Sequence, residues 1–297
     1  MPIPDNSLHW RERLHLYARL TRLDRPIGIY LLLWPTLWTL WLASGGLPSA
    51  PLLLVFVLGV ILMRSAGCAI NDYADRHVDP HVERTRDRPL ASGKLAPREA
   101  LIVFALIALT AFLLVLSLNP LTIALAFVGL ALAASYPFMK RFHHLPQLHL
   151  GLAYGWSIPM AWAAVANDVP WPAFALFLAN ILWTVAYDTM YAMADREDDL
   201  KIGVKSTAIL FGQYDIPIIA LLQLAALLTL YGVGLLTGRG LPYDLGLMGA
   251  ALTVLWQLYL LRHRRPDDCL RAFRNNNLFG ALVFAGIGLD FALAPAF

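Results

Sequence analysis

Nine apolar runs constrain the fold of this chain more than any other feature. Each run spans 17 to 22 residues, which lets a helix cross a hydrocarbon core of about 30 Å. Only 14% of the 297 residues are charged, against about 25% in soluble proteins. We therefore predict an all-α polytopic membrane protein with nine transmembrane helices, near residues 28–44, 51–70, 101–118, 121–138, 148–166, 172–193, 217–236, 245–261 and 278–296.

Basic residues alternate between the two sides of this predicted bundle. Of 23 lysines and arginines, 21 fall before the first run or in alternate connections, whereas the other connections share only Arg239. Cytoplasmic loops of membrane proteins carry such an excess. We therefore predict that the N-terminus and the long basic loops are cytoplasmic and that the C-terminus lies outside. Because this alternation accounts for the basic clusters, we expect no nucleic-acid partner.

The segment before the first span has a different character. In residues 1–27, arginines are interleaved with leucine and aromatic side chains. A helix of this kind lies in the membrane interface. We predict a cytoplasmic amphipathic segment over 1–27, followed by a single transmembrane domain over 28–297 that contacts the lipid bilayer.

Two acidic motifs close the second and the sixth apolar runs. Polar residues recur in them every four positions: Asn71, Asp75 and Asp79 in the first, Tyr191, Asp195 and Asp199 in the second. On a continuous helix each trio forms one stripe. Unpaired carboxylates so close repel one another and are costly beside hydrocarbon. A divalent cation relieves both problems, and ligands that are all oxygen favour Mg²⁺ or Mn²⁺ over zinc.

A structural alternative treats the two motifs as solvated helix ends. In that interpretation the carboxylates are neutralised by adjacent arginines such as Arg76 and Arg196. It does not explain why the same pattern occurs twice, and at the same place relative to an apolar run in both cases.

The motifs are copies of one another at an offset of 120 residues. The aspartates of the first match those of the second, whereas Asn71 corresponds to Tyr191. Four predicted spans separate the copies, an even number, so the repeats have parallel topology. We predict two four-helix halves, about 28–140 and 148–261, around a central cavity, with a ninth helix at 278–296.

Basic residues near both motifs are suited to a phosphate group that arrives with the metal. The set comprises Arg84, Arg86, Arg88, Lys94, Lys140, Arg141 and Lys205. Arg84 and Arg88 are four residues apart, and Lys205 occupies the analogous place after the second motif. These three are the strongest candidates from the residues alone, because the positive-inside bias already explains Arg86 and Lys94.

Charged and phenolic residues inside the spans mark further candidate site positions. Arg64 precedes Asn71 by seven residues, on the same face but deeper, and suits a small anionic co-substrate. The alternative is a structural ion pair, for example with Asp188. Asp188 is itself a candidate orienting group or base on the face of Asp195. Two tyrosines are candidate hydrogen-bond donors to a ligand: Tyr136 and Tyr191.

The two motifs resemble those of the UbiA family of intramembrane aromatic prenyltransferases. They read Asn71-Asp72-Tyr73-Ala74-Asp75-Arg76-x-x-Asp79 and Tyr187-Asp188-x-x-Tyr191-Ala192-x-x-Asp195-Arg196-x-Asp198-Asp199-x-Lys201-Ile202-Gly203-x-Lys205-Ser206-Thr207. The likeness runs from about Arg19 to Asn277. Flanking stretches point to the branch that prenylates 4-hydroxybenzoate in bacterial ubiquinone synthesis: Asp24-Arg25-Pro26-Ile27-Gly28, Leu33-Trp34-Pro35-Thr36-Leu37-Trp38, Tyr136-Pro137-Phe138-Met139-Lys140-Arg141 and Gly155-Trp156-Ser157-Ile158-Pro159-Met160.

The resemblance implies a reaction. A polyprenyl group would pass from polyprenyl diphosphate to the ring carbon ortho to the hydroxyl of 4-hydroxybenzoate, giving 3-polyprenyl-4-hydroxybenzoate and diphosphate. The enzyme would lie in the bacterial inner membrane, with a cytoplasmic active site and a periplasmic C-terminus. A lateral opening to lipid would admit the prenyl tail.

The resemblance also implies site residues. Mg²⁺ would be held by Asn71, Asp75, Asp79, Asp195 and Asp199. The diphosphate would be bound by Arg84, Arg88, Lys140 and Lys205. The aromatic acceptor would meet Arg64, Arg141 and Tyr136. The residues assigned to catalysis are Asp75, Asp195, Asp188 and Tyr191.

Three other functions remain open at this stage. A prenyltransferase of the same family for homogentisate, dihydroxynaphthoate or haem would share the acidic motifs. A cation transporter would also use intramembrane charge, but it predicts charges midway through the spans rather than at one face. A structural membrane scaffold would not need two metal-binding motifs.

Overall fold

The structure is a computed structural model that describes residues 10–293, and in that range every regular element is helical. The α-helices are α1 (Trp10–Leu20), α2 (Ile27–Ser44), α3 (Ala50–Asp75), α4 (Pro97–Val115), α5 (Pro120–Ser135), α6 (Pro146–Gly155), α7 (Ser157–Ala166), α8 (Trp171–Ala194), α9 (Arg196–Ile202), α10 (Thr207–Phe211), α11 (Asp215–Leu236), α12 (Leu241–Leu261) and α13 (Pro266–Leu293). Short 3₁₀ segments are η1 (Asp79–His81), η2 (Tyr136–Arg141) and η3 (Gly212–Tyr214). Over these residues, eight helical segments are long and apolar enough to cross a membrane. The predicted all-α, multi-pass membrane architecture is confirmed.

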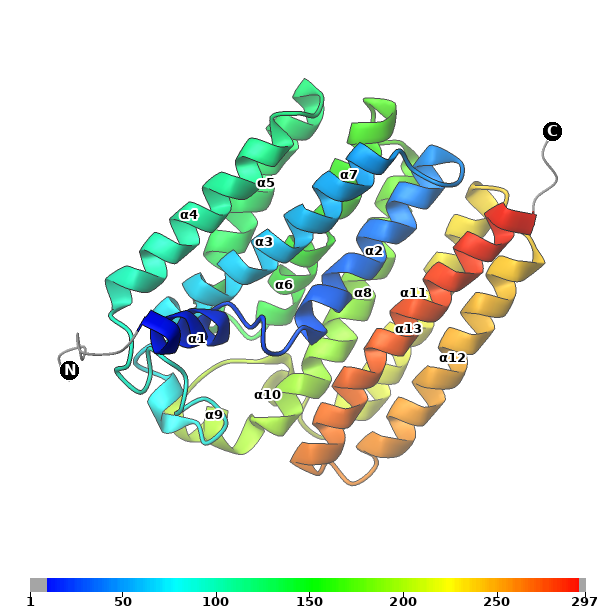
Figure 1. Cartoon of the computed structure of the whole chain (residues 1–297). Coiled ribbons are helices and arrows are strands. Elements are labelled where there is room, and N and C mark those ends of the chain that lie inside the picture. The colour runs from blue at the N-terminus through cyan, green and yellow to red at the C-terminus, as the bar shows by residue number, and fades with distance from the viewer. Residues whose placement is uncertain (1–9, 294–297) are drawn as a thin grey trace.

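The long helices run roughly side by side, and three short helices outside the predicted spans gather at one end of them (Figure 1). α1, α9 and α10 lie at this end, together with the turn between α12 and α13, whereas α13 finishes at the opposite end. The predicted amphipathic segment corresponds to α1, and residues 1–9 of that prediction lie outside the described residues.

Proline defines where many of the helices begin. Seven α-helices, α3, α4, α5, α6, α8, α12 and α13, carry proline at the first or second position, where its missing N–H has no intrahelical partner to lose. Gly45 ends α2 in the left-handed region with φ 64°, a conformation that glycine adopts without steric cost.

The largest hydrophobic cluster combines α2 with helices of the second half of the chain. α2, α8, α11, α12 and α13 enclose a core in which the Trp183 ring lies 5.4 Å from Trp38 and 5.1 Å from Phe279, between ring centroids. By contrast, only 11% of the residues in the most apolar part of α4 are buried, and the same share holds for the segment of α5 and η2. Side chains of α4, α5 and α3 line part of a cavity.

Two predicted spans have different boundaries in the structure. The run at 148–166 forms two helices, α6 and α7, that meet at Trp156, because Pro159 has no N–H to bond the carbonyl of Gly155. The last helix begins at Pro266 rather than near residue 278. Asp267 and Asp268 in its first turn stabilise that earlier start through the helix dipole.

Candidate active site

A cavity of about 1150 Å³ opens at the end of the bundle where the two acidic motifs lie. Thirteen of the fourteen predicted site residues line it. They comprise Arg64, Asn71, Asp75, Asp79, Arg84, Arg88, Tyr136, Lys140, Asp188, Tyr191, Asp195, Asp199 and Lys205. The structure therefore brings the two copies of the motif, 120 residues apart in sequence, to one site.

Arg141 is the exception among the predicted site residues, because it does not line this cavity. Its guanidinium donates to the carbonyl of Ala74 and lies 5.6 Å from the centroid of the Phe138 ring. From this position Arg141 secures the last turn of α3 instead of facing a ligand.

The prediction of one continuous helical stripe in each motif is wrong. α3 ends at Asp75, and Asp79 begins the 3₁₀ segment η1. Pro80 has no N–H to bond the carbonyl of Arg76, which disfavours continuation of the α-helix through this point. In the second copy, α8 ends before Asp195, and Asp199 lies one turn into the separate helix α9. The helix is therefore interrupted within each motif, and Asp75, Asp79, Asp195 and Asp199 all line the cavity.

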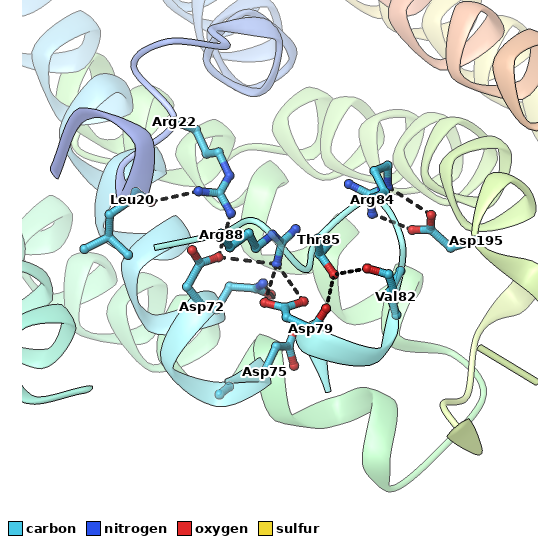
Figure 2. Close-up of polar contacts among 12 residues, drawn as sticks. Leu20, Arg22, Asp72, Asp75, Asp79, Val82, Arg84, Thr85, Arg88 and Asp195 are labelled. Atoms are coloured by element: carbon cyan, nitrogen blue, oxygen red, sulfur yellow. Dashed lines mark hydrogen bonds and ion pairs between the residues drawn. The ribbon is translucent and has the colours of Figure 1, made fainter. Parts of the chain in front are cut away.

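Each copy pairs its carboxylates with the basic residues predicted to bind phosphate. Lys140 Nζ lies 2.6 Å from Asp75 Oδ2. Arg88 Nη1 lies 2.9 Å from Asp79 Oδ2, and Figure 2 shows this pair beside Asp75. The site thus contains carboxylates in ion pairs with cationic side chains, and both kinds of group line one cavity.

The strongest of these pairs joins the two halves of the chain. Arg84 contacts both oxygens of Asp195, with Nε 2.9 Å from Oδ1 and Nη2 2.5 Å from Oδ2 (Figure 2). Its guanidinium also lies 4.5 Å from the centroid of the Tyr191 ring. A bidentate pair of this kind fixes orientation as well as charge. Burial lowers the pKa of Arg84, but Tyr191 and then Asp195 outweigh it, so that the pKa of Arg84 is raised.

Asp199 and Lys205 have different surroundings. Burial is the main cause that raises the pKa of the Asp199 carboxyl to about 7, and the charge of Asp195 adds to it. Lys205 Nζ donates to the carbonyl of Phe142 at 3.1 Å, and its backbone N–H donates to the carbonyl of Lys140 at 3.2 Å. Lys205 therefore ties the second motif to the segment that carries Lys140.

The arginines that follow the motifs do not neutralise them, as the structural alternative required. Arg76 lies over the ring of Tyr73, 4.4 Å from its centroid. Arg196 pairs with Asp215, which also binds Arg264 at 2.7 Å. Asp75 and Asp195 are instead paired with Lys140 and Arg84, which are distant in sequence, and Asp79 is paired with Arg88 in the loop that follows the first motif.

Asp72 is a site residue that the four-residue spacing did not identify. It is 1% exposed and accepts from Arg22 Nη2 at 2.7 Å, and Arg88 Nη1 lies 3.3 Å away (Figure 2). Arg22 belongs to the turn after α1 and has φ 58°. The signal was present in the first motif, because Asp72 follows Asn71 directly, but its position falls off the stripe. Asp72 links the N-terminal segment to Arg88 and through it to Asp79.

Deeper in the cavity, Arg64 lies on α3 among apolar and phenolic side chains. Its Nη1 donates to Cys68 Sγ at 2.6 Å, and its guanidinium lies 5.8 Å from the centroid of the Tyr154 ring. Its Nε is buried without a hydrogen-bond partner. Among residues 10–293 no ion pair joins Arg64 to Asp188, so the guanidinium is left with capacity for an anion.

The remainder of the cavity is apolar. It extends between three helices and is lined there by Val55, Phe56, Val60, Ala108, Ala111, Phe112, Val115, Ala126, Phe127, Leu130 and Ala133. These residues lie on α3, α4 and α5. The cavity therefore has a charged end at the acidic motifs and a hydrocarbon-like part along the poorly covered side of the bundle.

The donor set fits a cation that arrives with its own anionic ligands. Within the described part of the chain, no three His, Cys, Asp or Glu side chains come together as a ready-made metal cluster, because each motif places its carboxylates against basic groups. Asp75 Oδ1 is nevertheless buried without a partner. Mg²⁺ is usually bound through one or two carboxylates, with water and substrate phosphate completing its shell. The carboxylates present match that pattern.

A model of the UbiA prenyltransferase family matches residues 32–283. The chain belongs to this family. A 4-hydroxybenzoate octaprenyltransferase from Aeromonas salmonicida is 60% identical over 287 residues, which cover 97% of this chain and 99% of the relative. A protein of the same name from Nitrosococcus oceani is 59% identical over 284 residues, covering 96% and 100%.

Solved structures share the fold. The apo structure of a UbiA homolog from Aeropyrum pernix K1 aligns with a TM-score of 0.78 at 25% identity, covering 89% of this chain and 97% of that one. A UbiA homolog from Archaeoglobus fulgidus, bound to GPP and Mg²⁺, aligns with a TM-score of 0.72 at 18% identity, covering 92% and 99%. The predicted family is confirmed by the family model and by the sequence relatives, and the solved structures show the same fold.

Proposed function

We propose that this chain transfers a polyprenyl group from polyprenyl diphosphate to the carbon ortho to the hydroxyl of 4-hydroxybenzoate, with Mg²⁺, as a step of ubiquinone biosynthesis. One observation carries the proposal. Paired acidic and basic residues from both motifs meet at one end of a cavity whose remaining wall is apolar. Relatives about 60% identical bear the name of this activity.

The ion pairs suggest how the leaving group is recognised. Asp75, Asp79 and Asp195, with Asn71 and Asp199, would hold the metal. Once the metal binds these carboxylates, the basic side chains that pair with them in this structure can bind the phosphate oxygens instead. These side chains are Arg84, Arg88 and Lys140, and Lys205 would join them. When bound, Mg²⁺ would supply positive charge that stabilises the departing diphosphate.

The deeper residues are placed for the aromatic acceptor. We assign the benzoate carboxylate to Arg64, whose buried guanidinium makes one hydrogen bond to a described residue, and a contact with the ring or hydroxyl to Tyr136. Asp188 lines the cavity on the side of the second motif, where its carboxylate would accept the ring proton lost when the new C–C bond forms and the allylic C–O bond breaks. Tyr191 supports Arg84 through its ring face.

The apolar part of the cavity suits the prenyl tail, since α4 and α5 leave it near lipid. We also infer that α6 and α7 cross the membrane together, as a ninth crossing, with the acidic motifs on the cytoplasmic side of a bacterial inner membrane. The 21-to-1 distribution of basic residues supports this orientation, and the collection of α1, α9 and α10 at one end of the bundle agrees with it (Figure 1).

The full chain in proteoliposomes, given 4-hydroxybenzoate, a polyprenyl diphosphate and Mg²⁺, should form 3-polyprenyl-4-hydroxybenzoate and diphosphate. EDTA should stop the reaction. Parallel incubations with homogentisate, dihydroxynaphthoate and haem test the other branches of the family. Preferential prenylation of one of these acceptors would contradict the proposed substrate.

A further inference from the structure

The motif Asp24-Arg25-Pro26-Ile27-Gly28 has a structural partner inside the cavity. Gly28 lies in the first turn of α2, is buried and lines the same cavity as Arg64. A Cβ atom at position 28 would lie 2.2 Å from Arg64 Nε, 2.5 Å from Nη2 and 2.7 Å from Cζ. The guanidinium of Arg64 therefore occupies the space that any side chain at position 28 would need.

The backbone gives no other reason for glycine at this position. Gly28 is in regular α-helix and has no positive φ, and glycine inside a helix is less favourable than alanine. Four of the other glycines in helices, Gly59, Gly67, Gly232 and Gly288, have no heavy atom within 4 Å of the added Cβ position. The close approach at Gly28 is thus a specific contact with one charged group.

Two further contacts hold the guanidinium in this seat. Cys68, one turn further along α3, accepts from Nη1 at 2.6 Å, and the Tyr154 ring lies beside the group. Nε stays buried and unpartnered. The guanidinium is confined by the Gly28 backbone, by Cys68 Sγ and by the Tyr154 ring. Because these contacts leave it few positions, it is preorganised to bind an anion.

We propose that Gly28 is a specificity-determining residue, which seats Arg64 against α2 so that its guanidinium binds the carboxylate of the aromatic acceptor. This inference rests on the proposed function, because it presumes that the acceptor is an anionic benzoate. A side chain at position 28 displaces the guanidinium and removes selectivity for a carboxylate, without touching the ion pairs that bind diphosphate.

The test compares Gly28→Ala with Gly232→Ala in the full-length protein. Gly232 is also a helix glycine, but it lies on α11 outside the cavity and has open space around it. Gly28→Ala should raise the KM for 4-hydroxybenzoate about ten- to a hundred-fold, as loss of one charge-assisted contact does, and leave the KM for polyprenyl diphosphate unchanged. Gly232→Ala should change neither value. Stabilisation of the purified protein against heat by 4-hydroxybenzoate alone should weaken in parallel.

A double-mutant cycle separates this inference from the proposed function. If Gly28 acts through Arg64, adding Gly28→Ala to Arg64→Ala should change the acceptor KM no further. An unchanged acceptor KM in folded Gly28→Ala, while Arg64→Ala raises it, overturns the role of Gly28 alone. An unchanged acceptor KM in Arg64→Ala overturns the assignment of the carboxylate itself. Should Gly28→Ala not fold, Cys68→Ala replaces it, and an acceptor KM equal to wild type there contradicts the seating of Arg64.

Discussion

Replacing Arg88 with alanine tests whether the ion pairs of the active site exchange partners when substrate binds. Arg88 Nη1 lies 2.9 and 3.1 Å from the two oxygens of Asp79 and 3.3 Å from Asp72 Oδ1. In the variant Asp72 keeps its contact with Arg22. Asp79 has no second ion pair with any residue in the range 10–293, so its carboxylate is left without a countercharge.

Two effects are expected, a loss of folding stability and a weaker binding of the diphosphate substrate, and the structure sets the size of both. Breaking a buried ion pair by removing one partner costs about 3–5 kcal/mol, and the cavity beside this pair reduces the loss to roughly 2–3 kcal/mol of unfolding free energy, because water screens the remaining carboxylate. The diphosphate loses one charge-assisted contact worth about 1.5–3 kcal/mol. Its KM should therefore rise roughly ten- to a hundred-fold, while the KM for 4-hydroxybenzoate stays constant.

Thermal unfolding of the purified protein in detergent, with EDTA or with Mg²⁺ and no diphosphate, measures the first effect. Mg²⁺ should stabilise Arg88→Ala more than it stabilises the wild type, because the metal offsets the unpaired charge of Asp79. Arg86→Ala is the control, since Arg86 is an exposed residue of the same loop. Equal stabilisation of wild type and Arg88→Ala by Mg²⁺, together with an unchanged KM for diphosphate substrate, would refute the exchange of partners.

Three further predictions address the metal, the missed residue and the orientation. Asp75→Ala and Asp195→Ala should abolish turnover in rate assays while the protein remains folded in the membrane, whereas Asp198→Ala should stay active, because Asp198 does not line the cavity. Turnover of Asp75→Ala at the wild-type level would exclude a metal role. Asp72→Asn loses one charge in contact with Arg22 and Arg88 and should lower kcat/KM for polyprenyl diphosphate by about tenfold or more, with the acceptor KM unaffected; a selective rise of the acceptor KM instead would contradict the link to Arg88. In intact cells, Leu241→Cys should react with a membrane-impermeant thiol reagent and Lys94→Cys should not. The background should be low, because Cys68 and Cys269 are buried. The reverse labelling pattern would show that the predicted topology is inverted.

Hydropathy predicted the membrane class and most span positions, because long apolar runs leave few alternatives. It did not predict the break at Trp156, since Pro159 lies within a run that remains apolar on both sides. It also missed the start of α13 at Pro266. The polar residues 266–277 resemble a loop by composition, yet they continue the helix beyond the apolar run.

The residues of the site were largely predictable, whereas their pairing was not. Spacing within each motif located Asp75 and Asp195, but that argument treats each helix alone. The contacts of Asp195 with Arg84 and of Asp75 with Lys140 join segments 111 and 65 residues apart, and only the fold brings such segments together. Arg141 shows the opposite case, since a basic residue next to a site residue in sequence faces elsewhere.

The replacement of Asn71 by Tyr191 at the equivalent place of the second copy has a consequence for direction. A perfectly duplicated cage would present the same ligands to both ends of a diphosphate, and the group would bind equally well in two opposite senses. Only one sense sends the prenyl chain toward the apolar wall of α3, α4 and α5. The first copy has the amide of Asn71, whereas the second copy has the ring of Tyr191 against Arg84. This difference makes the two ends of the site distinguishable. The difference between the copies would thus give the candidate site a polarity that two identical motifs would lack.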